Sequence, residues 1–360
     1  MLPASKYHEM KSLLRTLSQV YDAAAWRRRR WYVARPHASR KLVRPVISVG
    51  ALAVGGSGKT PLTAYLARTL VSMGERPAVL SRGYGRVDPV DGVTVVRDTE
   101  RLVGDLATGG DEPWMLARSL DGVAVVVASD RYLAGRLAET HLGATVHLLD
   151  DGFQHLQLDR GTDLLIISAA DLDDSAVLPA GSFRERLATI RYADALFLVD
   201  VSETKRRWLV EHFQPPRLFT VRRQVSQAVV GWPALRSGRA LHPGTAVMAV
   251  AGIARPERFF EAVRASGLDL ICTRAAPDHH PYTRRAAVRL QADARAVQAQ
   301  AIVTTEKDFV RLESWQPFDP PLAMMPLTLD VGPDAGLRSF LSDQLVADRS
   351  NAGWECSQHV

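Results

Sequence analysis

The sequence predicts an α/β fold in which a parallel sheet carries helices on both faces, followed by a smaller C-terminal α/β lobe. Short β-branched and aliphatic runs alternate with helix-like segments, which is typical of strands buried on both faces. A glycine-rich loop joins the first run to a helix-like segment, and a second strand-and-helix pattern follows residue 200. The runs of the first part lie at residues 45–49, 77–81, 123–128, 146–149, 163–168 and 195–199.

Length and composition predict more than one domain. The chain has 360 residues, of which 46% are hydrophobic and 23% are charged, an ordinary globular composition that argues against disorder. A single core rarely grows to this length. We therefore expect a basic amphipathic arm at 1–43, a core at 44–205, a smaller C-terminal α/β lobe at 206–345 and a flexible tail at 346–360.

Cysteine content and hydropathy exclude several classes of protein. Two cysteines, Cys272 and Cys356, cannot form a disulfide framework or a four-thiolate zinc site, so we expect a reducing compartment. No apolar run approaches the roughly 18 residues that a transmembrane helix needs. The N-terminus also lacks the uninterrupted apolar segment of a signal peptide.

The first 45 residues are strongly basic. They contain eleven Lys or Arg and two acids and so carry +9; because the whole chain carries +6, the remainder carries −3. Trp26, Trp31 and Tyr32 flank a run of four arginines beside an apolar stripe at helical spacing. A helix lying on an anionic membrane surface has this pattern. The alternatives are a helix packed on the body with its charged face in water, and a nucleic-acid-binding segment. The stripe consists of Leu13, Leu14, Leu17, Val20, Tyr21 and Ala24.

A phosphate-binding loop is the strongest signal in the chain. The strand predicted at 45–49 leads into a glycine-rich segment that ends in Gly-Lys-Thr and opens a helix, which predicts a P-loop NTPase-like core. Backbone N–H groups of such a loop surround phosphate oxygens, Lys59 reaches the β- and γ-phosphates, and Thr60 offers its hydroxyl to Mg²⁺. Ala53 replaces the first glycine of the strict pattern. The predicted nucleotide-binding residues are Ala53, Val54, Gly55, Gly56, Ser57, Gly58, Lys59 and Thr60.

Two adjacent acids follow the run at 146–149. A P-loop protein needs a carboxylate at the end of a neighbouring strand to hold Mg²⁺ or its waters. Asp150 and Asp151 supply two, and their side chains point to different sides of an extended chain. Which of them contacts the metal stays open. The alternative is an ordinary Asp-Asp-Gly turn.

Polar clusters follow other predicted elements. Residues 81–86 place Arg82, Tyr84 and Arg86 on a glycine loop, where we expect them to contact a substrate. Asp111 precedes Glu-Pro and an apolar helix beginning at Trp114, so it is either a helix cap or a functional carboxylate.

The second pattern predicts an α/β lobe after an irregular stretch at 201–245. Asp278-His279-His280 falls in a loop of this lobe, between a strand and a basic helix. The chain offers no convincing further zinc ligands. A polar surface pair is one interpretation; the other is a histidine brought to the active site by closure of the lobe. The predicted strands are 246–251, 268–273 and 301–304, and the predicted helices are 256–266 and 283–299.

Taken together, these segments resemble the tetraacyldisaccharide 4′-kinases, the lipid A 4′-kinases of Gram-negative bacteria. The blocks that carry the resemblance occur in family order over residues 46–312. They are SVGALAVGGSGKTP (48–61), LSRGYGR (80–86), GDEP (110–113), LDDGFQHL (149–156), LPAGSFRER (178–186), VAGIARP (250–256), DHHPY (278–282) and TTEKDFVRL (304–312).

The resemblance implies a reaction and roles for residues. ATP would donate its γ-phosphate, with Mg²⁺, to the 4′-hydroxyl of a tetraacylated glucosamine disaccharide 1-phosphate. Asp150 and Asp151 would lie near the metal. Asp111 and His279 would form a pair that deprotonates the sugar hydroxyl. Arg184 would stabilise charge in the transition state, and Glu185 would contact Mg²⁺.

The same resemblance implies partners and a location. The substrate is a lipid A precursor in a bilayer, so the arm would dock on the anionic inner membrane at its cytoplasmic face; we expect no nucleic acid and no obligate protein partner. A P-loop GTPase or ATPase switch is an alternative, but the chain has only Thr-Glu-Lys-Asp at 305–308 where guanine recognition needs Asn-Lys-x-Asp. A nucleic-acid-dependent ATPase is the other alternative, and the net −3 of the body argues against it.

Overall fold

The computed structural model describes residues 4–56, 58–88, 91–231, 239–278 and 280–351. The chain forms two compact units that interleave in sequence. The first unit comprises Met1–Ser81, Asp130–Arg222 and Asp330–Val360, and the second comprises Arg82–Ser129 and Arg223–Leu329. The predicted order of core and lobe therefore needs correction, because residues 82–129 associate with the C-terminal lobe.

The first unit contains the predicted parallel sheet. Its strand order is β8-β7-β6-β1-β5-β2, and all neighbouring pairs in this series are parallel. Val49 of β1 pairs with Asp150 of β5, so the carboxyl ends of these two strands lie side by side. This position is where a parallel α/β sheet binds ligands. The strands are β1 (Val46–Ala51), β2 (Pro77–Ser81), β5 (Val146–Asp150), β6 (Thr162–Ser168), β7 (Ala195–Val199) and β8 (Leu218–Val225).

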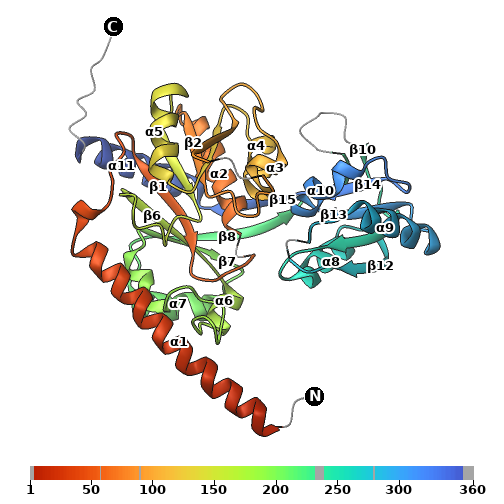
Figure 1. Ribbon diagram of the computed structural model, residues 1–360, viewed down its shortest axis with the longest axis horizontal. Helices are drawn as coiled ribbons and strands as arrows, with labels where there is room; N and C mark the ends of the chain where they lie inside the picture. The colour runs from red at the N-terminus through yellow and green to blue at the C-terminus, as the bar shows by residue number, and fades with distance from the viewer. Residues whose placement is uncertain (1–3, 57, 89–90, 232–238, 279, 352–360) are drawn as a thin grey trace. The chain divides into compact units, whose positions relative to one another are not determined.

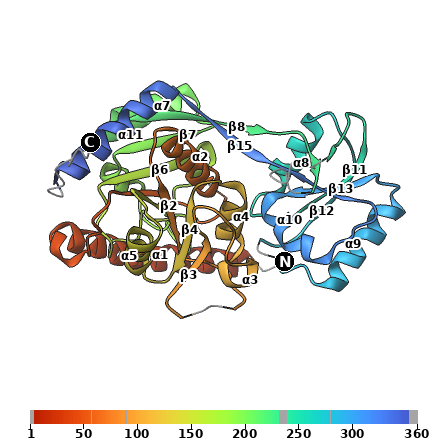
Figure 2. The ribbon, with the colours of Figure 1, turned by 90° about the horizontal axis from the view of Figure 1, so that it is seen from above.

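Helices cover both faces of this sheet. In Figure 1, α5 and α11 lie above β6 and β7, and α6 and α7 lie below these strands. Figure 2 shows the same elements from above. The helices are α2 (Lys59–Ser72), α5 (Arg131–His141), α6 (Ala169–Asp173), α7 (Glu203–Phe213) and α11 (Asp334–Asn351), with a 3₁₀ turn η2 (Leu187–Tyr192). The predicted α/β class with helices on both faces is confirmed.

Two predicted boundaries are wrong. The stretch 201–245 is not irregular, because it contains α7 and β8. Helix α7 buries only Leu209 and carries five charged side chains, so it lacks the apolar periodicity that marks a helix in the sequence. The predicted tail at 346–360 begins inside α11, which continues to Asn351, and its remainder lies outside the described residues.

The second unit contains an antiparallel strand pair and a six-stranded sheet. Strands β3 (Val93–Arg97) and β4 (Ala124–Ala128) pair antiparallel, and α3 (Leu106–Gly109) and α4 (Asp111–Ser119) lie between them in the chain. A six-stranded sheet has the order β10-β9-β14-β13-β11-β12, and its last four strands are mutually parallel. These strands are β9 (Val229–Val230), β10 (Arg239–Ala240), β11 (Ala246–Ala251), β12 (Asp269–Ala275), β13 (Ala301–Thr305) and β14 (Leu322–Met325).

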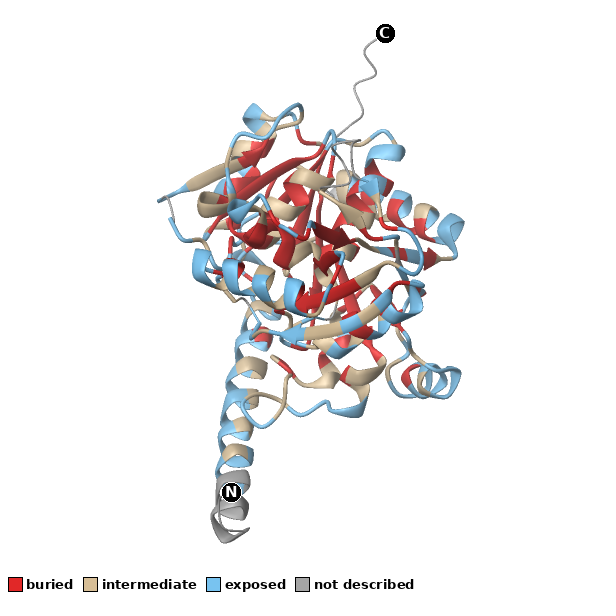
Figure 3. Cartoon of the chain, turned by 90° about the vertical axis from the view of Figure 1, so that its right-hand side faces the viewer, coloured by how far each residue is buried: buried red, intermediate tan, exposed pale blue. Residues whose placement is uncertain are grey.

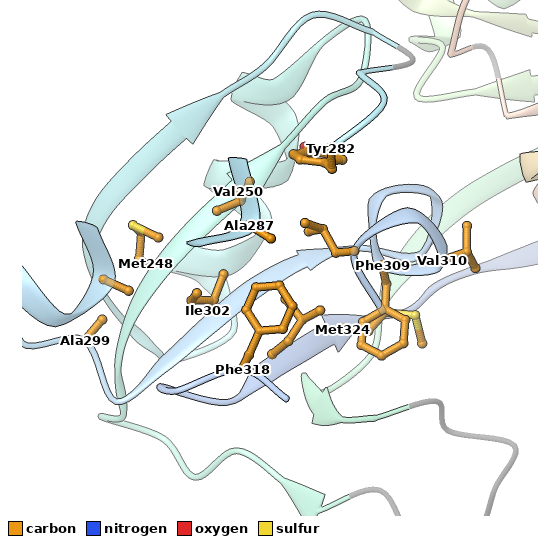
Figure 4. Packing of buried hydrophobic residues seen from close by; sticks show 13 residues of the cluster. Met248, Val250, Tyr282, Ala287, Ala299, Ile302, Phe309, Val310, Phe318 and Met324 are labelled. Atoms are coloured by element: carbon orange, nitrogen blue, oxygen red, sulfur yellow. The ribbon is translucent and has the colours of Figure 1, made fainter. Parts of the chain in front are cut away.

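A hydrophobic core explains why residues 82–129 join the C-terminal lobe. Met248, Ile302, Phe309 and Met324 are buried members of this core, and Figure 4 shows them. Leu106 and two residues of α4, Trp114 and Met115, pack against this cluster. Full burial of a large apolar side chain stabilises a fold by about 1.5–3 kcal/mol, and these three partly buried side chains each contribute a fraction of that. The remaining helices are α8 (Pro256–Ala265), α9 (Arg284–Ala296) and α10 (Glu306–Leu312).

The arm forms one long helix, α1 (Ala4–Val33), which belongs to the first unit. A polar stripe of this helix contacts the unit. Ser18 Oγ donates a hydrogen bond to the carbonyl of Val177 at 2.9 Å, and Asp22 forms an ion pair with Arg186 at 2.7 Å. From Ser12 to Val33, most residues of this helix are exposed, as Figure 3 shows. No helix among the described residues is long and apolar enough to cross a membrane.

Candidate active site

The loop between β1 and α2 has the geometry of a phosphate cradle. Gly55 and Gly58 adopt φ values of 94° and 95°, which L-amino acids with side chains rarely adopt. A β-carbon on Gly58 would also lie 3.3 Å from the Ile166 side chain. The loop is braced from outside, because the N–H of Val54 donates to the carbonyl of Ser182 at 2.8 Å. Ser57 lies outside the described residues.

Three charged side chains meet where this loop enters α2. Lys59 Nζ lies 3.6 Å from Asp151 Oδ1, and Arg184 Nη1 lies 2.7 Å from Asp151 Oδ2. Burial alone would raise the pKa of Asp151, but the charges of Lys59 and Arg184 outweigh it and hold that pKa below its usual value. Asp151 is therefore a carboxylate at neutral pH. The cluster presents two cations and one anion beside the phosphate cradle.

The oxygen ligands near this cluster fit Mg²⁺. Asp150 is 3% exposed and accepts a hydrogen bond from Thr63 Oγ1 at 2.9 Å, and Thr60 is 8% exposed at the start of α2. Asp151 Oδ1 is buried and accepts no hydrogen bond among the described residues, although Lys59 Nζ lies 3.6 Å from it. Hard cations take hydroxyl and carboxylate oxygens, and Mg²⁺ needs only one or two protein carboxylates beside phosphates and water.

Glu185, a predicted metal contact, is engaged elsewhere. It is 4% exposed, and its Oε2 accepts a hydrogen bond from Arg29 Nε at 2.9 Å. The structure therefore pairs Glu185 with α1, whereas it brings Lys59, Asp151 and Arg184 together.

In the second unit, Asp111 is not a helix cap. The N-cap of α4 is Gly110, and no side chain caps this helix end. Asp111 is 9% exposed, and its Oδ2 accepts a hydrogen bond from Arg311 Nη2. The cap interpretation of this aspartate is therefore wrong. Its carboxylate is held by a guanidinium from a helix that follows 200 residues later in the chain.

Arg311 belongs to a buried charge network. Its Nη1 lies 3.7 Å from Asp308 Oδ1, and Asp308 is fully buried. The N–H of Gly252 and the hydroxyl of Thr305 each donate to Asp308 Oδ2 at 2.8 Å. Burial raises the pKa of Asp308. The network thus links three segments distant in sequence: the start of α4, the end of β11 and α10.

Lys307 of α10 connects the loop after β12 to the start of α4. Its Nζ lies 3.4 Å from Asp278 Oδ1 and 3.6 Å from Glu112 Oε1. His280 packs edge-on against Tyr282 at a ring distance of 4.8 Å. The predicted His279 lies outside the described residues.

The glycine loop with the predicted substrate residues runs beside Asp111. A β-carbon on Gly110 would lie 2.9 Å from the carbonyl of Tyr84, and one on Gly85 would lie 3.9 Å from Asp111 Oδ2. A pocket of about 290 Å³ opens on this loop, and it is lined by Arg82, Gly83, Tyr84, Gly85, Arg86 and Ser129. All three predicted substrate residues line it.

Comparison with known proteins decides the family. The family model described as tetraacyldisaccharide-1-P 4′-kinase matches residues 10–346. A tetraacyldisaccharide 4′-kinase of Geobacter metallireducens is 39% identical over 84% of this chain and 88% of its own length, and one of Rhodopseudomonas palustris is 37% identical over 94% and 93%. The chain belongs to this family.

A solved structure supports the same conclusion. The LpxK protein of Aquifex aeolicus, solved in complex with ATP, is 30% identical and has a TM-score of 0.74, covering 93% of this chain and 99% of its own. As a tetraacyldisaccharide 4′-kinase family member, the chain is an ATP- and Mg²⁺-dependent phosphotransferase of lipid A biosynthesis that acts on the 4′-hydroxyl of the disaccharide precursor. The GTPase and nucleic-acid alternatives are set aside.

The sequence did not predict three residues that the structure places in buried ion pairs of the site or next to it. Arg311 and Asp308 lie within the block at 304–312, which was assigned no role. Arg29 was treated as one of four equivalent arginines. A buried ion pair between residues far apart in sequence leaves no local pattern. Asp308 and Arg311 lie within a motif block, whereas Arg29 lies outside all of them.

Proposed function

We propose that the two units of this kinase divide the reaction. The first unit holds the phosphates of ATP on the loop before α2, with Lys59 neutralising charge on the β- and γ-phosphates. The second unit prepares the acceptor, with Asp111 as the base for the 4′-hydroxyl. The observation that carries this proposal is the buried carboxylate of Asp111, held by Arg311 beside the pocket of the glycine loop.

The chemistry balances through these residues. Asp111 takes the proton of the 4′-hydroxyl, whose oxygen forms a bond to the γ-phosphorus while the bond to the β-phosphate oxygen breaks and ADP leaves. The guanidinium of Arg311 donates a hydrogen bond to the carboxylate of Asp111 and fixes its orientation. Arg184, which also holds Asp151, stabilises charge on the transferring group. Bound Mg²⁺ supplies further neutralisation of phosphate charge, with Thr60 and Asp150 or Asp151 as its protein ligands.

His279 lies outside the described residues, and we propose that it assists Asp111, as the family resemblance implies. It follows Asp278, which Lys307 holds near Glu112 of α4. A histidine next to a catalytic carboxylate can orient it and share its proton.

The acceptor side of the proposal can be tested through Arg82. Its guanidinium lines the pocket, so Arg82→Ala should raise the KM for the anionic lipid about tenfold by removing a charge-assisted hydrogen bond. The KM for ATP should stay unchanged, as measured by initial rates in detergent. Arg264→Ala, an exposed arginine on α8 of the same unit, is the matched control. A rise in the KM for ATP alone would contradict the assignment.

We further propose that α1 seats the enzyme on the cytoplasmic face of the inner membrane. Its exposed face carries the apolar stripe, including Leu13, Leu17, Val20 and Tyr21. The opposite face contacts the first unit through Ser18 and its neighbours. Leucines and aromatic residues flanked by arginines suit an anionic lipid surface.

Neighbouring substitutions test the orientation of α1. Val20→Glu places a charge on the apolar face, whereas Gln19→Glu places the same charge off that face. We expect Val20→Glu to weaken binding to anionic phospholipid vesicles at least about tenfold, because about 1.5 kcal/mol of apolar burial is lost and a carboxylate is desolvated. Gln19→Glu should lower binding only slightly. Equal flotation of the two variants would refute a lipid-facing stripe.

A further inference from the structure

The four-arginine run of α1 contains one buried member. Arg29 is 2% exposed, whereas Arg28 and Arg30 on either side are exposed. The Arg29 guanidinium lies 4.3 Å from the centre of the Phe153 ring, and its Nη2 donates to the carbonyl of Phe153 at 2.8 Å. Its Nε donates to Glu185 Oε2 at 2.9 Å. A fully buried arginine needs such partners to offset its desolvation.

Both partners of Arg29 are next to residues of the charged cluster. Phe153 lies two residues after Asp151, and Glu185 follows Arg184 directly. Asp151 and Arg184 are themselves paired at 2.7 Å. Two loop segments, residues 151–153 and 184–185, are therefore connected twice. The Asp151–Arg184 pair joins them directly, and Arg29 of α1 contacts both, through Phe153 and Glu185.

Both loop segments also contact the strand and loop that lead to Lys59, so they have little freedom to move independently of the phosphate-binding loop. The N–H of Arg184 donates to the carbonyl of Leu52 at 2.7 Å. A β-carbon on Gly50 would lie only 2.4 Å from Phe153 Cβ, which shows how closely Phe153 packs on the end of β1. A shift of either loop segment would therefore change the position of the phosphate-binding loop that carries Lys59.

We propose that Arg29 is a positioning residue of the kinase: with Glu185 as its anchor, it holds the Asp151–Arg184 pair in place beside Lys59. Glu185 is then a structural carboxylate and not a metal ligand. This inference rests on the roles proposed above for Asp151 and Arg184. It makes α1 a part of the catalytic unit in addition to its role at the membrane surface.

The partners have opposite charges and are both buried, so removing either one leaves an uncompensated charge. Burial raises the pKa of Glu185, and the positive charge of Arg29 opposes that rise. Without Arg29, Glu185 takes up a proton or moves toward water, and the loop that carries Arg184 moves with it. Removing both charges together avoids this penalty.

A double-mutant cycle tests the inference. Arg29→Met, Glu185→Gln and the double variant are compared in detergent by kcat, by the KM values of ATP and the lipid, and by the Mg²⁺ concentration that gives half-maximal rate. We expect each single change to lower kcat about tenfold or more, with the KM for the lipid changed less than about twofold. The double variant should be no worse than the worse single one. The half-saturating Mg²⁺ concentration should stay the same in all three.

Matched variants separate positioning from loss of fold. Arg349→Met removes another partly buried arginine of the same unit, which pairs with Glu75 at 2.7 Å, and should leave kcat unchanged. Arg29→Lys should recover part of the kcat that Arg29→Met loses. If Arg29→Met does not fold, Arg29→Lys and Glu185→Asp form a milder cycle in which the same non-additivity is expected.

Distinct outcomes would overturn the inference. Additive losses in the cycle would show that Arg29 and Glu185 act independently. A Mg²⁺ requirement that rises in Glu185→Gln but not in Arg29→Met would restore Glu185 as a metal ligand. Arg184→Met is measured in parallel. Full activity of this variant would refute the proposed role of Arg184. A loss of kcat in Arg29→Met would then be explained by displacement of Asp151 alone.

Discussion

Replacing Lys59 with methionine should lower kcat by about a thousandfold, the largest effect of any single change in the first unit. Methionine keeps the length and apolar stem of lysine but removes the charge that neutralises the transferring phosphate. The same change removes a cation 3.6 Å from Asp151 and should raise the pKa of that carboxylate. Steady-state rates of ADP formation in the presence of the lipid measure the effect.

A matched control keeps this prediction specific. Lys205 lies on α7 of the same unit and pairs with Asp173 on the surface. Lys205→Met should therefore keep the activity of the unchanged enzyme. Turnover by Lys59→Met within about threefold of that level would contradict the assignment of the phosphate-binding loop.

Asp111→Asn should lower kcat by about a hundredfold to a thousandfold and leave ATP affinity unchanged. Asparagine has the shape of aspartate but cannot accept the proton of the 4′-hydroxyl. Arg311 retains Asp308 at 3.7 Å, so the buried guanidinium is not left without a counter-charge. Nucleotide affinity by calorimetry and turnover by steady-state kinetics separate binding from chemistry.

The exposed Asp269 at the start of β12 is the control for this change. Asp269→Asn should have the kinetics of the unchanged enzyme. Near-normal turnover by Asp111→Asn would refute the role of Asp111 as the base. A loss of ATP affinity in Asp111→Asn would instead place Asp111 on the nucleotide side of the reaction.

The parts of the fold that local patterns specify were predictable. The strands at 77–81, 195–199 and 246–251 occur at the predicted residues, because continuous apolar runs mark strands buried on both faces. The phosphate-binding loop was predictable for a similar reason, since its glycine spacing and its place between a strand and a helix are both local. Asp150 follows from the strand that precedes it.

The interleaving of the two units was not predictable from local patterns. Residues 82–129 join the C-terminal lobe because α4 packs on its core, and nothing in the sequence of α4 says which core receives Trp114. The partner of Asp111 was not predictable either, because Arg311 occurs 200 residues later, in the short helix α10.

The structure of the N-terminal arm was predictable only in part. Its helix and its apolar stripe were predicted from spacing, and the helix is confirmed. Sequence reasoning treated the four arginines alike, because the burial of Arg29 depends on Phe153 and Glu185, which lie more than 100 residues away. The same contact removes Glu185 from the predicted metal ligands, although it is adjacent to a proposed catalytic arginine.

The central claim is that ATP bound on the loop before α2 gives its γ-phosphate to a hydroxyl deprotonated by Asp111. The most direct measurement follows the transfer of label from γ-labelled ATP to tetraacylated disaccharide 1-phosphate by the purified chain and by Asp111→Asn, both saturated with ATP and Mg²⁺. The account predicts label at the 4′ position with the unchanged enzyme, and with Asp111→Asn a rate reduced at least about a hundredfold although ATP remains bound. Equal transfer by the two enzymes, or label released only as inorganic phosphate by the unchanged one, would contradict it.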